Sequence, residues 1–283
     1  MKHSWVGLLA ICAILGWSLC GCVGAAETAG LAPPAAKAEA TEPPSLLETV
    51  QEVAAGMVES GPVDMPEATP TNAQPLPEVD LTRPMVALTF DDGPMEGSTA
   101  HILDILEANG ARATFFVQGK QAAKHPELVR RAYGLGCQIG NHTYNHKDLT
   151  SLNNRDALGQ LASVNSLVQE LTGEGCALVR PPHGKGWRDS RILNLVPYPL
   201  ILWSIDTNDW STRDPKTTIA AVLEDVKDGD IVLMHDIYEE TAEAAAAIVP
   251  ELLARGYQLV TVSEMFAYKG LELSPGNAYR QAG

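Results

Sequence analysis

The stretch Met85–Pro94 reads MVALTFDDGP and decides how the rest of the chain is organised. Its first six residues are mostly apolar, as in a strand that is covered on both faces of a sheet. Asp91 and Asp92 follow at once, and Gly93 and Pro94 then favour a turn. Taken alone, the stretch fits a strand that ends in a solvated turn. It also fits a strand that delivers two carboxylates to a site, where one binds a metal and the other moves protons.

Six further apolar runs follow, separated by amphipathic segments. These runs are Ala113–Val117, Gly136–Gly140, Cys176–Arg180, Leu200–Ser204, Asp230–Met234 and Tyr257–Val262. In the segment after residue 153, apolar residues recur every three or four positions, which marks one face of a helix. Strands that alternate with helices predict an α/β fold with a parallel sheet of about seven strands. Periodicity alone leaves a closed barrel and an open doubly wound sheet as alternatives.

The composition excludes one class of partner. With 283 residues, the chain is long enough for one sizeable core plus tails. A formal net charge of -15 argues against nucleic acid, because phosphate backbones are bound through clustered Lys and Arg. No pattern in the sequence speaks to the oligomeric state.

The N-terminal residues predict export. A short polar start precedes an apolar run that is short for a membrane span. Within it, Leu19–Cys22 resembles the bacterial lipobox, which implies that Cys22 carries a lipid and anchors the protein to a membrane. Cleavage near Ala25 and an uncleaved anchor are the alternatives, and all three predict an extracytoplasmic protein. The segment that follows is rich in Ala, Pro and Glu and predicts a disordered stalk. The predicted parts are an export signal, this linker, a single folded domain and a tail, at residues 1–22, 23–80, 81–270 and 271–283.

Polar residues follow the predicted strands at their carboxyl ends. They are Asp91 with Asp92, His142 with His146, Arg180, Asp209 with Trp210, and His235. In parallel α/β folds these strand ends meet at one rim, where active sites are built. His142 and His146 are four residues apart, so a helical turn there would aim both imidazoles at one metal. A pair of surface histidines is the alternative.

Five motifs together carry a family resemblance. TFDDGP, NHTYNH, RPPHG, DTNDW and LMHD occur between Pro84 and Phe266 in the order and spacing of the NodB-homology polysaccharide deacetylases, carbohydrate esterase family four. The chain resembles this family, which implies a distorted (β/α) barrel of seven to eight parallel strands as a single catalytic domain. The resemblance also implies a metal-dependent hydrolase that removes acetyl groups from N-acetylglucosamine-type residues of an envelope glycan, with peptidoglycan as the expected substrate.

The resemblance implies a metal ion held by Asp92, His142 and His146. Zinc is the expected ion, with cobalt, manganese, nickel and iron as alternatives. One carboxylate and two imidazoles leave positions open for water and substrate, which suits hydrolysis.

The same resemblance assigns the proton transfers. Asp91 resembles the general base, and Arg180 the residue that orients it and keeps it ionised. His235 resembles the general acid, with Asp209 beside it to raise its pKa. A buried ion pair away from any site is the alternative for Arg180 and Asp209.

The resemblance places Pro182, His183, Trp210 and Leu233 on the substrate side. Trp210 and Leu233 would wall a pocket for the acetyl methyl group, and the backbone N–H of His183 would help to stabilise the oxyanion. Trp210 as an ordinary core residue is the alternative. The chain departs from the family at His183, where Tyr is usual, so we expect a different subsite wall and an imidazole that could compete for the metal.

Cys137 and Cys176 begin the two predicted strands that lead to His142 and Arg180. Neighbouring strands that start at similar heights could bring them within bridging distance, and export makes a disulfide chemically reasonable. Two small buried thiols are the alternative, because a disulfide forms only where the distance and orientation of the two cysteines allow it.

Three other functions compete with the leading one. An O-acetyl glycan esterase of the xylan type would use the same groups. A catalytically silent glycan-binding module would keep the fold without turnover, but such modules usually lack a ligand or the base. An iron oxygenase would share the two-histidine, one-carboxylate ligand set, although the acid and histidines of oxygenases usually lie close together in sequence.

Overall fold

The computed structural model describes residues 79–283. The export signal, the lipidation site Cys22 and nearly all of the linker lie outside the described residues, so their assignment stays a prediction. Across the described part, no helix combines the length and the apolar character that crossing a membrane requires.

The centre of the fold is a six-stranded parallel sheet in the order β3-β2-β1-β6-β5, with β7 also paired to β1. The strands are β1 (Met85–Asp91), β2 (Thr114–Val117), β3 (Gln138–Asn141), β5 (Ile205–Asp206), β6 (Ile231–His235) and β7 (Gln258–Leu259). All residues of β1 are buried, as expected for a central strand covered on both faces. At its end, Asp91 lies opposite Phe116 of β2 and His235 of β6.

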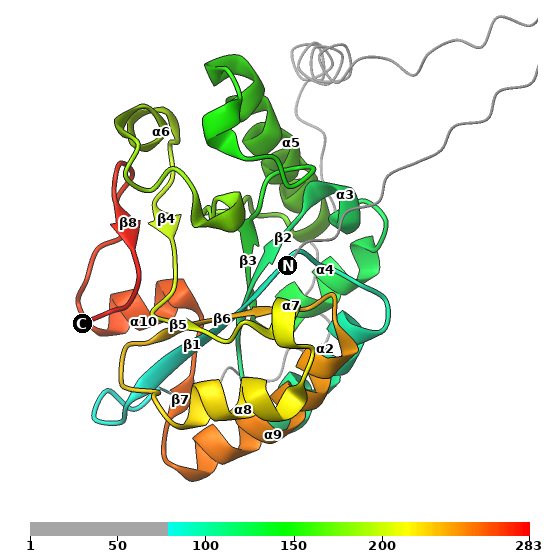
Figure 1. Cartoon of the computed structure of the whole chain (residues 1–283), viewed down its shortest axis with the longest axis vertical. Helices are drawn as coiled ribbons and strands as arrows, with labels where there is room; N and C mark the ends of the chain where they lie inside the picture. Colours follow the sequence, from blue (N-terminus) through cyan, green and yellow to red (C-terminus); the bar gives the residue numbers. More distant parts are fainter. Residues whose placement is uncertain (1–78) are drawn as a thin grey trace, which may run out of the picture. The chain divides into compact units, whose positions relative to one another are not determined.

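A second parallel pair extends the sheet towards a barrel. This pair is β4 (Leu200–Ile201) with β8 (Ala278–Tyr279). Val179 bridges both Asn141 of β3 and Leu200 of β4, so the parallel order continues from β3 to β8. An antiparallel bridge between Asp230 and Gln281 then joins the far end to the start of β6. The predicted parallel α/β barrel is confirmed, and Figure 1 shows β4 beside β8.

Helices follow most strands and cover the outside of the sheet. They are α2 (Ser98–Asn109), α3 (Gly119–Ala122), α4 (Pro126–Gly134), α5 (Asn154–Thr172), α6 (Ser190–Leu195), α7 (Asp209–Thr212), α8 (Pro215–Leu223), α9 (Glu239–Ala254) and α10 (Val262–Tyr268), with short 3-10 turns at η1 (Leu149–Ser151) and η2 (Pro182–Gly184). α9 packs against both α2 and α8 (Figure 1). The side chain of Asn153 caps α5, and Gly173 ends it with a left-handed φ of 84°.

The C-terminal residues 271–283 are part of the barrel and not the tail that the sequence predicts. β8 pairs with β4, and Ala282 is fully buried in the core. The backbone N–H of Ala282 donates to the carbonyl of Gly229, and the N–H of Gly229 donates to Met85 at the start of β1. The prediction failed because a two-residue strand without apolar alternation gives no periodic signal.

The predicted Cys137–Cys176 disulfide is absent. Both cysteines are buried free thiols, and burial raises the pKa of each to about 12. Cys137 precedes β3, and Cys176 lies in irregular chain before the isolated bridge at Val179. The two cysteines therefore do not begin a pair of neighbouring strands, as the sequence suggested.

Gly229→Ala tests whether the C-terminal segment closes the barrel. Gly229 has a φ of 93°, and an added Cβ would collide with the carbonyl oxygen of Ala282. We expect a loss of about 2 kcal/mol or more in the free energy of unfolding, measured by urea denaturation. Gly159→Ala is the control, since Gly159 lies in α5 with nothing within 4 Å, and it should stabilise by about 0.5–1 kcal/mol. Equal stability of the Gly229→Ala variant and the wild type would contradict the closure.

Candidate active site

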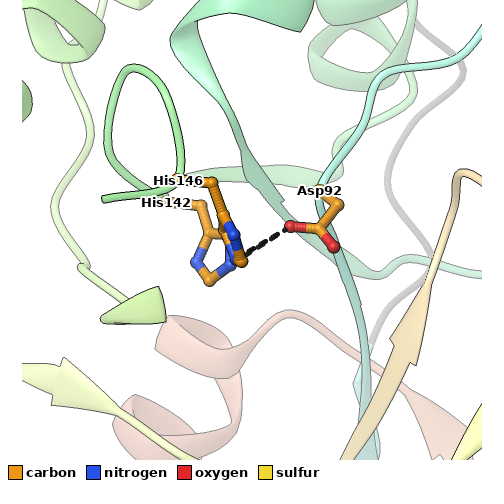
Figure 2. Close-up of side chains that lie close together, drawn as sticks. All are labelled: Asp92, His142 and His146. Atoms are coloured by element: carbon orange, nitrogen blue, oxygen red, sulfur yellow. Dashed lines mark ion pairs between the residues drawn. The ribbon is translucent and has the colours of Figure 1, made fainter. Parts of the chain in front are cut away.

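The three predicted metal ligands meet at the carboxyl ends of β1 and β3. Asp92 lies directly after β1, His142 directly after β3, and His146 in the loop that follows (Figure 2). The Oδ1 atom of Asp92 is 3.4 Å from Nε2 of His142 and 3.3 Å from Nε2 of His146. One candidate ligand atom from each residue lies within 4.8 Å of the others.

The two histidines converge through a loop and not through the helical turn that their spacing suggests. Residues 142–148 are irregular, and Thr143 and His146 have left-handed φ values of 65° and 59°. Non-glycine residues rarely adopt this conformation, and they cluster at functional sites where the surroundings enforce it. Asp92 has a φ of 78° as well. The site is therefore held by tight turns.

The buried ring of His142 has one orientation fixed by its neighbours. Its Nδ1 lies 2.7 Å from the backbone carbonyl oxygen of Arg180, so Nδ1 carries the proton and donates it. Nε2 is then left with its lone pair towards Asp92. Burial opposes charge on both groups, yet the nearby opposite charges prevail and raise the pKa of His142 while lowering that of Asp92. Two imidazole nitrogens and a carboxylate oxygen are a donor set that fits a divalent ion such as zinc.

Asp91 and Arg180 form a buried ion pair beside the triad. Nη1 of Arg180 donates to Oδ1 of Asp91 at 2.8 Å and to the hydroxyl of Thr89 at 2.7 Å. Its Nε and Nη2 donate to the carbonyls of Ile201 and Leu202. Arg180 thus occupies one carboxylate oxygen of Asp91. The other, Oδ2, lies 3.7 Å from Nε2 of His142 and faces the site.

His235 and Asp209 form a second charged pair on the same rim. Nδ1 of His235 lies 2.8 Å from Oδ1 of Asp209, and the backbone N–H of His235 donates to Oδ2 of Asp209 at 2.7 Å. The hydroxyl of Thr241 also donates to Oδ2. Burial disfavours the imidazolium, but the hydrogen bond and charge of Asp209 outweigh it and raise the pKa of His235 to about 9.

The predicted substrate-side residues differ in exposure. Trp210 is 52% exposed, whereas Leu233 is 4% exposed and lies in the interior. Pro182 is buried, while His183 is exposed in η2 with a φ of 59°. The ring of His183 packs edge-on against His146, with 4.7 Å between centroids. Within the described residues, the cluster of ligand atoms comprises Asp92, His142 and His146 and does not include His183.

Sequence reasoning missed two groups that hold Asp92 and its turn. Gln118 donates from Nε2 to Oδ1 of Asp92 at 2.8 Å, and its position one residue after β2 was a signal that strand-end reasoning could have used. Asp236 is buried and accepts from the backbone N–H of Gly93 at 2.9 Å and from the hydroxyl of Thr99 at 2.7 Å. Burial raises the pKa of Asp236 to about 7.

The fold and the rim together define the class of this protein. It is a parallel α/β barrel in which one carboxylate and two histidines form a candidate metal site beside an acid that is held by an arginine. Residues 78–198 match the family described as polysaccharide deacetylase. The chain belongs to the polysaccharide deacetylase family.

Three relatives illustrate the similarity. The chain is 39% identical to the peptidoglycan-N-acetylmuramic acid deacetylase PdaC of Bacillus subtilis over 66% of its own length, and spans 40% of the length of that relative. It is 34% identical to a peptidoglycan-N-acetylglucosamine deacetylase of Bacillus cereus, covering 68% of this chain and 92% of the relative. A solved family 4 acetyl xylan esterase from Clostridium thermocellum, in complex with a cobalt ion, aligns with a TM-score of 0.66 and 32% identity over 70% of this chain and 98% of the esterase.

The raised pKa of His235 gives a test that needs no substrate. In the metal-free protein, NMR titration should find His235 still protonated at pH 8, because its pKa is about 9 against an ordinary value of about 6.5. Asp209→Asn removes the charge that favours the imidazolium, so the pKa should fall by about one unit or more. Asp206→Asn is the matched control: Asp206 is exposed and bonds to Asn208, and it should leave the titration of His235 nearly unchanged. A wild-type pKa near 6.5 would contradict the pairing.

Proposed function

We propose that this protein is a metal-dependent deacetylase that hydrolyses the N-acetyl group of N-acetylglucosamine-type residues in peptidoglycan and releases acetate. One observation carries the proposal. Asp91, held by Arg180, and His235, held by Asp209, are partners on neighbouring strands at the same rim as the candidate metal ligands. A carboxylate paired with a cation and an imidazole paired with an anion lie next to the candidate metal ligands. They can serve as the base and the acid that amide hydrolysis requires.

Asp92, His142 and His146 would hold the ion. Zinc is the ion we propose, with cobalt, manganese, nickel and iron as alternatives, and the related esterase of known structure contains cobalt. When bound, a divalent ion lowers the pKa of a coordinated water towards about 7 and polarises an acyl oxygen. The open positions left by three protein ligands suit that role.

Asp91 would act as the general base. Arg180 fixes its Oδ1, so Oδ2 is free to accept a proton from the water that attacks the acetamide carbon. The buried guanidinium keeps the carboxylate oriented, and it loses its partner if Asp91 is removed.

His235 would act as the general acid. Asp209 occupies its Nδ1, which leaves Nε2 to donate a proton to the amide nitrogen as the carbon–nitrogen bond breaks. Because the pKa of His235 is about 9, the imidazole holds that proton at neutral pH. The products are acetate and a sugar with a free amine.

The substrate-side residues would position the acetyl group. Leu233 and the exposed Trp210 would contact the acetyl methyl, and the backbone N–H of His183, next to Pro182, would stabilise the oxyanion. O-Acetyl glycan hydrolysis is the second candidate, because it needs the same groups and the related esterase acts on an ester. The names of the two peptidoglycan-active relatives favour an amide of peptidoglycan.

We place the enzyme outside the cytoplasm. The export signal over residues 1–22 and the names of the relatives support this location. The lipobox at Leu19–Cys22 supports the finer proposal of a lipid on Cys22 that anchors the protein to a membrane.

Asp91→Asn tests the base. Asn keeps an oxygen for Arg180, whereas Ala would leave a buried guanidinium unpaired at a cost of about 3–5 kcal/mol. We expect acetate release to fall roughly 10²–10⁴-fold because the proton acceptor is lost, while calorimetry still finds one metal ion per chain. Asp92→Asn is the comparison, and it should weaken metal binding itself. Undiminished acetate release by the Asp91→Asn variant would contradict the assignment.

A substrate panel tests the reaction. Acetate release would be measured from peptidoglycan, chitooligosaccharides and acetylated xylan, each with a chelator and after addition of zinc or cobalt. We expect release from peptidoglycan that the chelator stops and the metal restores. Release from acetylated xylan alone would favour the esterase, and binding without release from any glycan would overturn the enzymatic proposal.

A further inference from the structure

Two arginines gather on one tryptophan beside the site, and no step described above uses them. The guanidinium of Arg188 lies 4.0 Å from the centroid of the Trp187 ring, and that of Arg280 lies 5.3 Å from it. Arg188 follows Trp187 in the loop between η2 and α6, while Arg280 follows β8. Two segments almost a hundred residues apart in sequence therefore place positive charge on one indole.

Trp203 links this cluster to the active site. Arg280 donates from Nε to the carbonyl of Trp203 at 3.3 Å, and the ring of Trp203 lies 5.7 Å from the guanidinium of Arg180. An added Cβ on Gly184, next to His183, would lie 2.9 Å from the Trp203 ring, so the loop leading to Trp187 lies directly on Trp203. Arg280 thus contacts the residue whose ring lies near Arg180, and Trp187 follows Gly184 by three residues in the same loop.

The charge of the cluster is not neutralised within the described part of the chain. Lys185, in the same loop, is paired with Asp148 at 3.0 Å. Arg188 and Arg280 are both exposed, and in residues 79–283 neither lies within 4.0 Å of a carboxylate oxygen. The chain has 35 acidic residues against 20 basic ones, so acidic side chains were plentiful as partners. Like charges held close together repel each other unless an anion joins them.

We propose that Trp187, Arg188 and Arg280 form a subsite that binds carboxylate groups of the glycan strand during deacetylation. Guanidinium groups bind carboxylates through two parallel hydrogen bonds, and the Trp187 ring, over which both guanidinium groups lie, holds them in place. Peptidoglycan carries such carboxylates on its stem peptides, and on the lactyl group where a stem peptide has been removed, whereas chitooligosaccharides carry none. The subsite rests on the proposed deacetylase function, which it deepens by making acidic glycans the preferred substrates.

The test compares one glycan with its neutralised form. Peptidoglycan fragments would be used with their carboxylates free and after those carboxylates are converted to amides. The ratio of kcat/KM for the free form to that for the amidated form is the readout. We expect this ratio to fall roughly fivefold in Arg188→Gln and in Arg280→Gln, and roughly tenfold or more in the double variant. The change should lie in KM and not in kcat. The wild-type preference should also shrink as salt is raised.

Arg130→Gln provides the matched control, since Arg130 is exposed on α4 and its loss removes the same charge. Its ratio should equal that of the wild type. An unchanged ratio in the double variant would overturn the subsite, and so would an equal loss on both glycans, which would indicate a structural role.

Direct binding separates this proposal from the proposed function. Calorimetry with both glycan forms on the Asp91→Asn protein measures the preference for carboxylates without turnover. A carboxylate preference that disappears in the arginine variants supports the subsite even if acetate is never released. Acetate release without any such preference would leave the deacetylase standing and refute the subsite.

Discussion

The buried guanidinium of Arg180 is the interaction on which the rest of the site depends. Its side chain joins Asp91 of β1 to the carbonyls of Ile201 and Leu202, so it ties the central strand to the end of β4. Its own carbonyl accepts from Nδ1 of His142 and fixes that ring. One residue therefore orients both the candidate base and a candidate metal ligand, and both lose their geometry if it moves.

Such a group is costly to bury, and the site shows how the cost is offset. A fully buried charge is tolerated only when it is paired and its donors are satisfied. Arg180 meets this condition with one carboxylate, one hydroxyl and two carbonyls, and Phe116 lies 4.2 Å from it. The fork of a guanidinium can make these bonds at fixed angles, whereas the single ammonium of a lysine could not.

Two buried pairs of oppositely charged groups lie on the same rim. The guanidinium of Arg180 holds the carboxylate of Asp91, whereas the carboxylate of Asp209 holds the imidazole of His235 and raises its pKa against the effect of burial. Both partners are themselves buried, so solvent screens neither pair strongly. Because Asp91 and His235 are register partners on β1 and β6, the sheet itself sets the distance between the candidate base and the candidate acid.

The sequence predicts the rim better than the parts around it. The strand-end rule located Asp91, Asp92, Arg180 and His235, because parallel strands must bring their carboxyl ends together. The rule could not predict the conformation of the loop that carries His142 and His146, since left-handed residues such as His146 depend on tertiary contacts. The predicted strand Cys176–Arg180 is reduced to bridges at Val179, because Pro181 and Pro182 follow and lack the N–H donors that a ladder needs.

The C-terminal segment shows why some elements of the fold could not be predicted from the sequence. β8 is two residues long and carries no alternation, and only its pairing with β4 and the burial of Ala282 define it. Yet the same pairing that closes the barrel carries Arg280 to Trp203 and so to the edge of the active site. If Arg280 belongs to the proposed subsite, a contact made for closure also positions a charge that would meet the substrate. Barrel closure and substrate preference are then coupled, since loosening β8 would also displace an arginine from the rim.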